Sequence, residues 1–226
     1  KTEVIDLRNF YMLPGLVDSH GHMTHLGKNQ YEVDLRDCKS EFEVVEKIKT
    51  FLDLNNNLSW VNGGGWNQEK FDIKLLPDNK YLSMNFPDIP VTLSRIDGHA
   101  IWCNKKALDM ANIQEDTPVP DGGEILKKDG LLTGILVDKA QQLIWDIIPS
   151  ESIDDVKKWI LKAQEICLSK GLTEVHDAGI SSIQFDAYKE LINENKLKIR
   201  VYAMANQELF ENNVSKYKSE LFELKS

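Results

Sequence analysis

The spacing of apolar residues is most regular in the last third of the chain. Apolar positions at helical spacing follow Ser152, and a strand-like run follows at residues 172–177. The same two patterns recur at residues 185–192 and 197–204, and a third helix is expected over residues 208–221. Strands and helices that alternate at these lengths predict a parallel sheet with right-handed crossovers.

The first 60 residues show two further patterns. Residues 3–12 alternate weakly and contain β-branched and aromatic side chains, which predicts two short strands before Pro14 and Gly15. Residues 16–22 begin apolar and end polar, as a buried parallel strand does where it emerges from the sheet. Ser40 and Glu43 have the spacing of a capping box, and a helical apolar pattern follows them.

The segment from about residue 59 to 150 is less regular. It contains a glycine-rich turn at residues 63–65, a short strand at 90–96, a helix after Asn104, a hairpin up to Gly134 and a helix over 135–147. Because clean alternation is missing here, we interpret this α+β segment as an insertion. The chain has fewer candidate parallel strands than the eight of a closed (β/α)8 barrel, so we expect it to be truncated at both ends.

The amino-acid composition and charge argue against several classes of function. The 36 acidic and 27 basic residues give a net charge of −9, which argues against a nucleic-acid partner. The chain has no apolar run long enough to span a membrane. Its three cysteines are far apart and form no Cys-x-x-Cys pair, which favours a reducing compartment such as the cytoplasm. The sequence leaves a homo-oligomer open.

His20 and His22 are the sharpest chemical signal. Side chains two apart on a strand share a face, and by this rule Asp18 lies on that face as well. Two imidazoles can then reach one divalent ion, although zinc, iron, nickel and copper all accept such ligands. The alternative is a pair of polar residues at a strand end without a metal.

Residues 14–22 read Pro-Gly-Leu-Val-Asp-Ser-His-Gly-His, and this segment is similar to the first barrel strand of the amidohydrolase superfamily. Residues 65–68, 95–100 and 104–108 resemble further motifs of its family 3 branch, which includes N-substituted formamide deformylase. The branch also has counterparts of three later segments, which are residues 122–125 (Gly-Gly-Glu-Ile), 133–138 (Thr-Gly-Ile-Leu-Val-Asp) and 171–179.

The resemblance implies a partial TIM-like barrel of α/β class, with a remnant of a small β-sandwich at residues 1–13. Residues 14–226 would then be the N-terminal part of the barrel, with about its first three strands and the insertion at about 59–150. It implies a divalent metal, most often zinc, as one or two ions held in part by His20 and His22. The reaction implied is hydrolysis of a C–N bond other than a peptide bond, in a small amide, formamide or cyclic amide, by a metal-activated water. The remaining ligands and the general-base Asp are expected beyond residue 226, so this fragment alone should be inactive.

The resemblance also suggests substrate contacts, each with a structural alternative. His99 would orient the substrate, or else bond to Asp97. Arg95 would bind the substrate, or else form an ion pair with Asp97. Trp66 would line a pocket wall, or else pack in the core. Asn104 is interpreted as a helix cap.

His176 and Asp177 follow each other at a strand end, so one faces inward and the other outward. At least one should belong to the site, unless Asp177 only caps the next turn. His25 is expected to be a solvated loop residue. Two other functions remain open, which are a non-catalytic metal-binding or interaction module and a hydrolase of C–O or P–O esters on the same scaffold.

Overall fold

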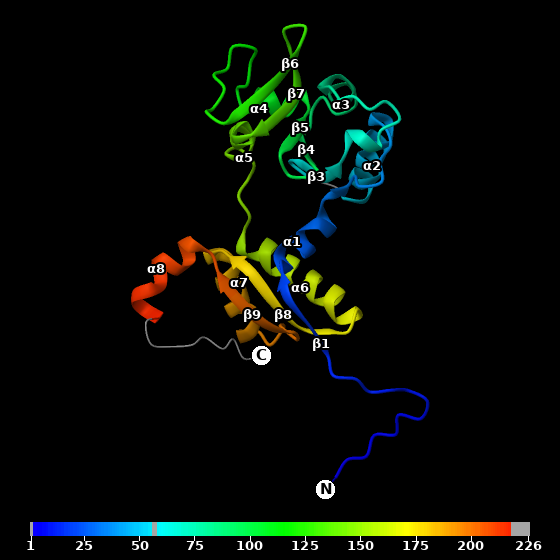
Figure 1. The fold of residues 1–226 in the computed structure, drawn as a ribbon, viewed down its shortest axis with the longest axis vertical. Helices are drawn as coiled ribbons and strands as arrows, with labels where there is room; N and C mark the ends of the chain where they lie inside the picture. The colour runs from blue at the N-terminus through cyan, green and yellow to red at the C-terminus, as the bar shows by residue number, and fades with distance from the viewer. Residues whose placement is uncertain (1, 56–57, 218–226) are drawn as a thin grey trace. The chain divides into compact units, whose positions relative to one another are not determined.

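The computed structural model describes residues 2–55 and 58–217. The chain divides into two compact units (Figure 1). Unit 1 comprises residues 1–30 and 151–226, and unit 2 comprises residues 31–150. Each unit has hydrophobic clusters formed only from its own residues. The backbone therefore leaves unit 1, builds unit 2 completely and then returns.

A three-stranded parallel sheet forms the centre of unit 1. Its strands are β1 (Leu16–Gly21), β8 (Leu172–Ile180) and β9 (Arg200–Ala205), adjacent in the order β1-β8-β9. Both neighbouring pairs are parallel. This confirms the expected parallel order of the strands that contain Val17, Val175 and Val201.

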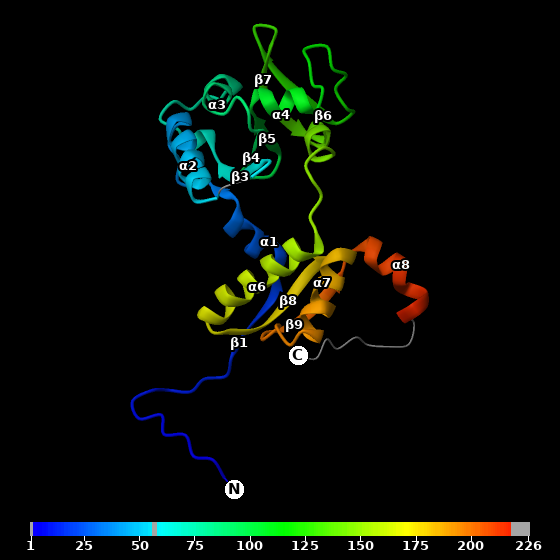
Figure 2. The same cartoon turned by 180° about the vertical axis from the view of Figure 1, so that it is seen from behind.

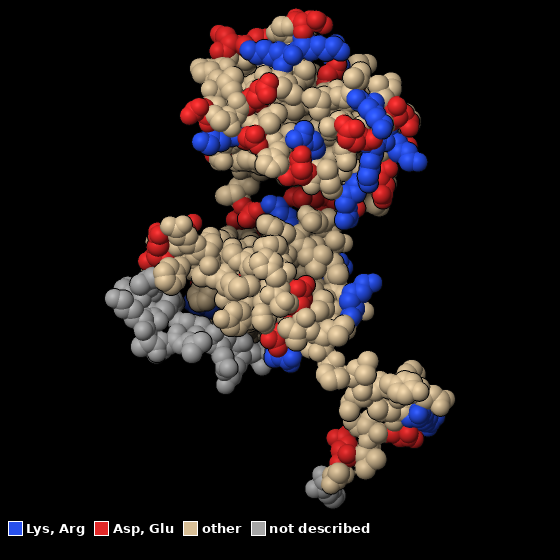
Figure 3. All heavy atoms as spheres, in the orientation of Figure 1, with Lys and Arg blue, Asp and Glu red and all other residues tan. Residues whose placement is uncertain are grey.

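Two helices, α6 (Ile153–Ser169) and α7 (Ser182–Asn193), cover one face of this sheet (Figures 1 and 2). α6 begins as predicted, because Ser152 Oγ accepts the N–H of Asp155 and the Asp155 carboxylate accepts the N–H of Ser152. On the opposite face, Val17 and Tyr202 are 51% and 54% exposed. The front of unit 1 in Figure 3 accordingly shows few charged side chains.

Two shorter helices complete unit 1. α1 (Met23–Lys28) follows β1 directly and lies against α6. α8 (Gln207–Tyr217) follows β9, as the apolar spacing predicted, while residues 218–221 of the predicted helix lie outside the described residues.

The two strands predicted within residues 3–12 are absent, since residues 2–15 contain no strand. Val4, Phe10 and Tyr11 are 86%, 81% and 95% exposed. A two-stranded hairpin is marginal in water without a surface to cover its apolar face, and no described segment covers these residues. The β-branched and aromatic residues of this segment are therefore not sufficient on their own to form strands.

Unit 2 is a six-stranded mixed sheet with helices on both faces, in the strand order β2-β3-β4-β5-β7-β6. β2, β3 and β4 are parallel, and the remaining pairs are antiparallel. One cluster joins the sheet to α2 and α3, and a second cluster joins it to α4 and α5. Its strands are β2 (Val33–Asp34), β3 (Val61–Trp66), β4 (Val91–Arg95), β5 (Ala100–Cys103), β6 (Gly123–Lys128) and β7 (Leu131–Asp138). Its helices are α2 (Glu41–Leu54), η2 (Gln68–Lys70), α3 (Asn79–Asn85), α4 (Lys105–Met110), η3 (Lys139–Gln141) and α5 (Gln142–Trp145). The short helix η1 (Asn29–Tyr31) contains the last two residues of the first segment of unit 1 and the first residue of unit 2.

Unit 2 differs from the sequence-based interpretation in three places. It begins at Tyr31 rather than near residue 59, because α2 packs its apolar face on this sheet. The glycine-rich segment predicted as a turn is strand β3, where a Cβ at Gly63 would lie 2.8 Å from the carbonyl oxygen of Val33. The helix predicted over residues 135–147 is wrong, because residues 135–138 belong to β7 and only α5 is α-helical.

Two other sequence observations have structural counterparts. None of the helices that the structure describes is long and apolar enough to cross a membrane. Cys38, Cys103 and Cys167 are free and buried. Burial raises the pKa of the Cys103 thiol to about 12.

Candidate functional site

The end of β1 is shaped by a β-bulge. Asp18 pairs with Val175 and Gly21 pairs with Asp177, so β1 uses one more residue than β8 over this stretch. Val175 faces the helices. Paired residues of parallel strands share a face, so Asp18 and Gly21 also face the helices. A Cβ at Gly21 would lie 3.0 Å from Val175 Cγ1 and 3.5 Å from Asp18 Oδ2, which agrees with this placement.

The prediction that Asp18 shares a face with the two histidines is therefore wrong. Simple alternation holds from His20 to His22 but fails between Asp18 and His20, where the extra residue lies. The Asp18 carboxylate instead accepts the backbone N–H of His20 at 3.0 Å. Asp18 thus fixes the bulge that turns the histidines away from the helices.

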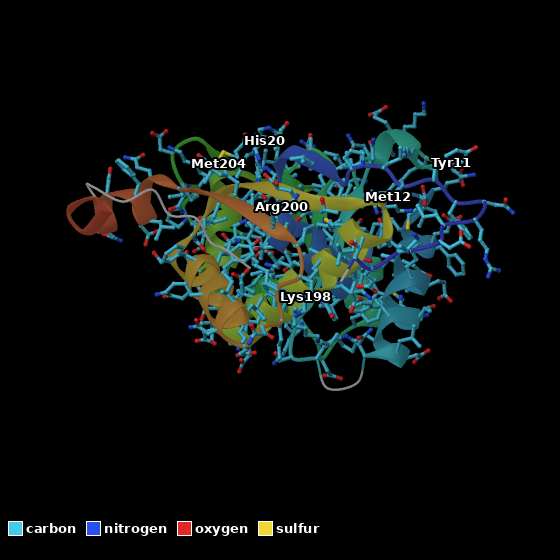
Figure 4. All side chains as sticks on the ribbon, turned by 90° about the horizontal axis from the view of Figure 1, so that it is seen from below. Tyr11, Met12, His20, Lys198, Arg200 and Met204 are labelled. Carbon is cyan, nitrogen blue, oxygen red and sulfur yellow. The ribbon has the colours of Figure 1, made fainter. Side chains whose placement is uncertain are left out.

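His20 and His22 lie together at the carboxyl end of β1. Their ring centroids are 5.5 Å apart in an edge-to-face arrangement, and both residues are exposed. Figure 4 shows His20 and Met204 on the side of the sheet opposite to α7. This agrees with the expectation that the two imidazoles lie on one side of the strand end.

The His22 ring is oriented by the neighbouring strand. Its Nδ1 lies 3.0 Å from the carbonyl oxygen of Ala178, so Nδ1 carries the proton and donates it. The lone pair of the neutral ring is then on Nε2. A metal-binding histidine commonly donates its second ring nitrogen in this way, since the bond fixes both tautomer and ring orientation.

A polar cavity of about 260 Å³ opens beside His22. Its walls include Thr24, Asp177, Ser181 and Gln184. His25 also lines it, with its ring centroid 5.8 Å from that of His22. His25 is exposed as expected, but it belongs to helix α1 rather than to a loop.

Asp177 contributes to the wall of this cavity and is at the same time a buried anchor. Its side chain accepts the N–H of Met23 at 2.9 Å and the hydroxyl of Tyr188 at 2.6 Å. Burial raises the pKa of Asp177, against the lowering effect of these two hydrogen bonds. Asp177 ties the start of α1 to the end of β8, and its contact with a substrate stays a prediction.

His176 faces the other way, as period two requires. Its Nε2 lies 3.3 Å from Glu174 Oε1, and its ring packs on Tyr202 with centroids 5.0 Å apart. Arg200 Nε donates to Glu174 Oε2 at 2.9 Å and is the main reason that the pKa of Glu174 is lowered. Sequence reasoning missed Glu174 and Arg200, although their register across β8 and β9 follows from strand alternation. His176 thus belongs to a charged cluster on the face away from the helices.

The other predicted substrate contacts lie in unit 2. Arg95 Nε donates to Asp97 Oδ1 at 2.8 Å, and this bond is the main reason that the pKa of Asp97 is lowered. The same oxygen accepts the backbone N–H of His99 at 3.0 Å. Arg95 and Asp97 therefore form the ion pair of the structural alternative and shape the turn before His99.

The His99 ring bonds to Asp138, not to Asp97. His99 Nδ1 donates to Asp138 Oδ1 at 2.8 Å. The His99 side chain is 69% exposed and that of Asp138 is 51% exposed. Asp138 was not identified as a site residue from the sequence, although it closes the Thr-Gly-Ile-Leu-Val-Asp segment.

Trp66 and Asn104 have structural roles. Trp66 is fully buried, donates its indole N–H to the carbonyl of Leu93 at 2.8 Å and packs edge-on against Trp102. A substrate cannot reach it, so the pocket-wall hypothesis is wrong for this residue. Asn104 caps α4 as predicted, by accepting the N–H of Ala107 at 3.0 Å.

A model of the amidohydrolase family matches residues 3–224. The chain belongs to the amidohydrolase family. YtcJ of Bacillus subtilis is 36% identical over 92% of the chain, which covers 40% of that protein. N-substituted formamide deformylase of Arthrobacter pascens is 27% identical over 83% of the chain and is covered to 36%. The chain thus spans less than half the length of these relatives.

Solved structures agree with the family assignment. An uncharacterized metal-dependent hydrolase of Pyrococcus horikoshii superposes with a TM-score of 0.68 at 27% identity. The match covers 90% of this chain and 38% of that protein. A second metal-dependent hydrolase, from Pyrococcus furiosus, gives a TM-score of 0.66 at 29% identity.

The side chains at the end of β1 can supply some, but not all, of the ligands of a metal site. Within residues 2–55 and 58–217, no group of three or more His, Cys, Asp or Glu side chains is arranged to hold an ion. His20 and His22 provide two exposed imidazoles, whereas a catalytic zinc site commonly has three protein ligands. The pair is therefore suited to a divalent ion only together with further ligands.

Proposed function

We propose that the complete protein is a metal-dependent hydrolase of C–N bonds other than peptide bonds, in small amides, formamides or cyclic amides. The observation that carries the proposal is the His20 and His22 pair at the end of a parallel strand, in which a backbone carbonyl orients the His22 ring. The membership in the amidohydrolase family and the metal-dependent hydrolases among the similar structures support it.

In this proposal β1, β8 and β9 are the first three strands of a TIM-like barrel, and unit 2 is inserted after the first. Parallel order and helices on one face support this arrangement. His20 and His22 would hold a divalent ion, for which zinc is the first candidate. Such an ion polarises a substrate carbonyl and makes a bound water more acidic.

The chain's own residues have separate proposed tasks. Ala178 keeps Nε2 of His22 directed away from the backbone, and Asp177 fixes the turn from β1 into α1. His99 would orient the substrate through its exposed ring. With two of the ligands, residues 1–226 alone should bind the ion weakly and be inactive. The three free, buried cysteines support a cytoplasmic location.

The test uses the complete protein with the variants His20→Ala and His22→Ala. Each should lower the bound metal per protein and reduce hydrolysis by orders of magnitude, because a lost ligand weakens the site. Metal content is measured by elemental analysis. Activity is measured as hydrolysis of N-substituted formamides, cyclic amides and esters. His25→Ala is the matched control for metal binding, since it removes a neighbouring exposed imidazole that is not a proposed ligand and should leave the bound metal unchanged.

His99→Ala should reduce kcat/KM by ~10²- to 10³-fold with unchanged metal content. Full metal content in both His20→Ala and His22→Ala would contradict the proposed ligands. Hydrolysis of esters but not amides would replace the proposed substrate class. The alternative from another class is a non-catalytic metal-binding module, and metal binding by the complete protein without any hydrolysis would establish it.

A further inference from the structure

Asp138 has a backbone conformation that aspartate rarely adopts. Its φ is 47° and its ψ is −121°, a region in which glycine is the usual residue. An aspartate here strains the chain at the point where β7 ends. Strain of this kind is commonly retained where a side chain has a functional task.

Backbone hydrogen bonds fix the position of Asp138 relative to His99. Asp138 donates its backbone N–H to the carbonyl oxygen of His99 at 2.9 Å, and the next residues, Ala100 and Val137, are paired in the antiparallel ladder. Gln141 Nε2 donates to the carbonyl oxygen of Gly98 at 3.1 Å. The backbones on both sides of the pair are therefore fixed before any ligand arrives.

The hydrogen bond between the side chains sets the chemistry of the imidazole. A carboxylate only accepts hydrogen bonds, so His99 Nδ1 must carry the proton in the bond to Asp138. In the neutral ring the lone pair is then on Nε2. A hollow of about 790 Å³ lies beside Asp138, and its walls include Gly98, Asp138, Gln141 and Trp145 but not the His99 ring. This volume is in the range of small-molecule sites.

We propose that Asp138 is a positioning residue that holds the exposed His99 ring in the Nδ1–H tautomer, so that Nε2 accepts a hydrogen bond from an N–H or O–H group of the substrate. This inference rests on the proposed role of His99 in orienting substrate and deepens it. It assigns the ligand a donor group at this point. A secondary amide has such an N–H group.

Two variants separate the carboxylate from the backbone. Asp138→Asn keeps the size of the side chain but offers the ring either a carbonyl oxygen or an amide N–H. Asp138→Gly removes the carboxylate and relieves the backbone, so the Tm should be unchanged or raised. Asp129 provides the matched control, because it is an exposed aspartate with a φ of 54° in the turn between β6 and β7. Asp129→Asn and Asp129→Gly should change neither readout below.

The first readout is the tautomer of His99 in the complete protein labelled with ¹⁵N-histidine. Spectra recorded at a pH where an ordinary imidazole is neutral should show a protonated Nδ1, with the signals assigned by their loss in His99→Ala. In Asp138→Asn and Asp138→Gly the population of this tautomer should fall. The second readout is kcat/KM for an N-substituted formamide, which should fall ~10- to 10²-fold in both Asp138 variants.

Three results would overturn the inference. These are a protonated Nε2 in the unmodified protein, an unchanged tautomer in both Asp138 variants, and full kcat/KM in both Asp138 variants when His99→Ala has lost it. A lower Tm in Asp138→Gly, in proportion to the loss of activity, would also assign Asp138 a purely structural role. If the complete protein hydrolyses no amide, the proposed function fails, and the tautomer readout alone decides whether Asp138 positions His99.

Discussion

Neighbouring residues at the end of β8 have opposite environments. His176 lies on the uncovered face beside Glu174, whereas Asp177 is 2% exposed and bonds two buried donors. The alternation was predictable from the sequence. Which of the two residues is anchored was not predictable, because one partner of Asp177 is Met23 of α1, 154 residues away in sequence, and the other is Tyr188 of the following helix α7.

We expect Asp177→Ala to lower the free energy of unfolding by about 2–5 kcal/mol, because the Met23 N–H and the Tyr188 hydroxyl lose their acceptor in a buried site. Urea denaturation measures this change. Asp177→Asn is the control, since its Oδ1 accepts from Met23 and its Nδ2 donates to Tyr188, so it should cost about 1 kcal/mol or less. Equal losses in the two variants would show that the hydrogen bonds are not the source of the stability.

Cys103 should be inert in the folded protein. Burial raises its pKa to about 12, so at pH 8 the reactive thiolate is negligible. Iodoacetamide should therefore label Cys103 only after denaturation, as peptide mass spectrometry will show. Labelling of native Cys103 at the denatured rate would mean that the cluster around it opens readily.

At the scale of elements, the strand that sequence reasoning missed is β3. Three consecutive glycines normally weaken a strand, so residues 63–65 had the composition of a turn. Their role depends on the neighbouring strand, because the Val33 backbone lies too close to Gly63 for a side chain. The bulge in β1 is similar, since the extra residue is visible only in its pairing with β8. Helix starts were more predictable, because Ser152 and its cap partner are three residues apart.

Two of the three consecutive glycines of β3 provide a sharp test. Gly63→Ala should destabilise the fold by about 1–3 kcal/mol, since its Cβ would lie 2.8 Å from the Val33 carbonyl oxygen. Gly64→Ala should be neutral or stabilise by about 0.5 kcal/mol, since its Cβ would lie 3.6 Å from Ser94 Cβ. Thermal unfolding compares them. If Gly63→Ala is as stable as Gly64→Ala, β2 is not packed as closely on β3 as described.

At the scale of the whole molecule, the two units differ in how completely they bury their sheets. The sheet of unit 2 has a hydrophobic cluster on both faces. That of unit 1 has helices on one face, while Val17 and Tyr202 on the other remain about half exposed. The regular alternation after residue 150 made unit 1 predictable. Unit 2 was harder, because its parallel strands give way to antiparallel ones.

We expect residues 31–150 to fold when expressed alone, because all members of their two clusters lie within this range. Circular dichroism should show one cooperative thermal transition, and a hydrophobic dye should bind weakly. Residues 1–226 should bind the dye more strongly through the uncovered face of unit 1. A non-cooperative transition of the excised segment would show that unit 2 depends on unit 1.

The pairing of β1 with β8 also has a consequence for protein synthesis. The two strands are neighbours in the sheet, yet all of unit 2 is encoded between them. At ~5–20 residues per second, a ribosome needs roughly 8–30 s to make the ~150 residues that separate them. During that time the nascent β1, with the histidine pair at its end, has no partner strand. Folding of unit 2 can finish first, so the candidate metal centre is assembled late, when translation delivers β8.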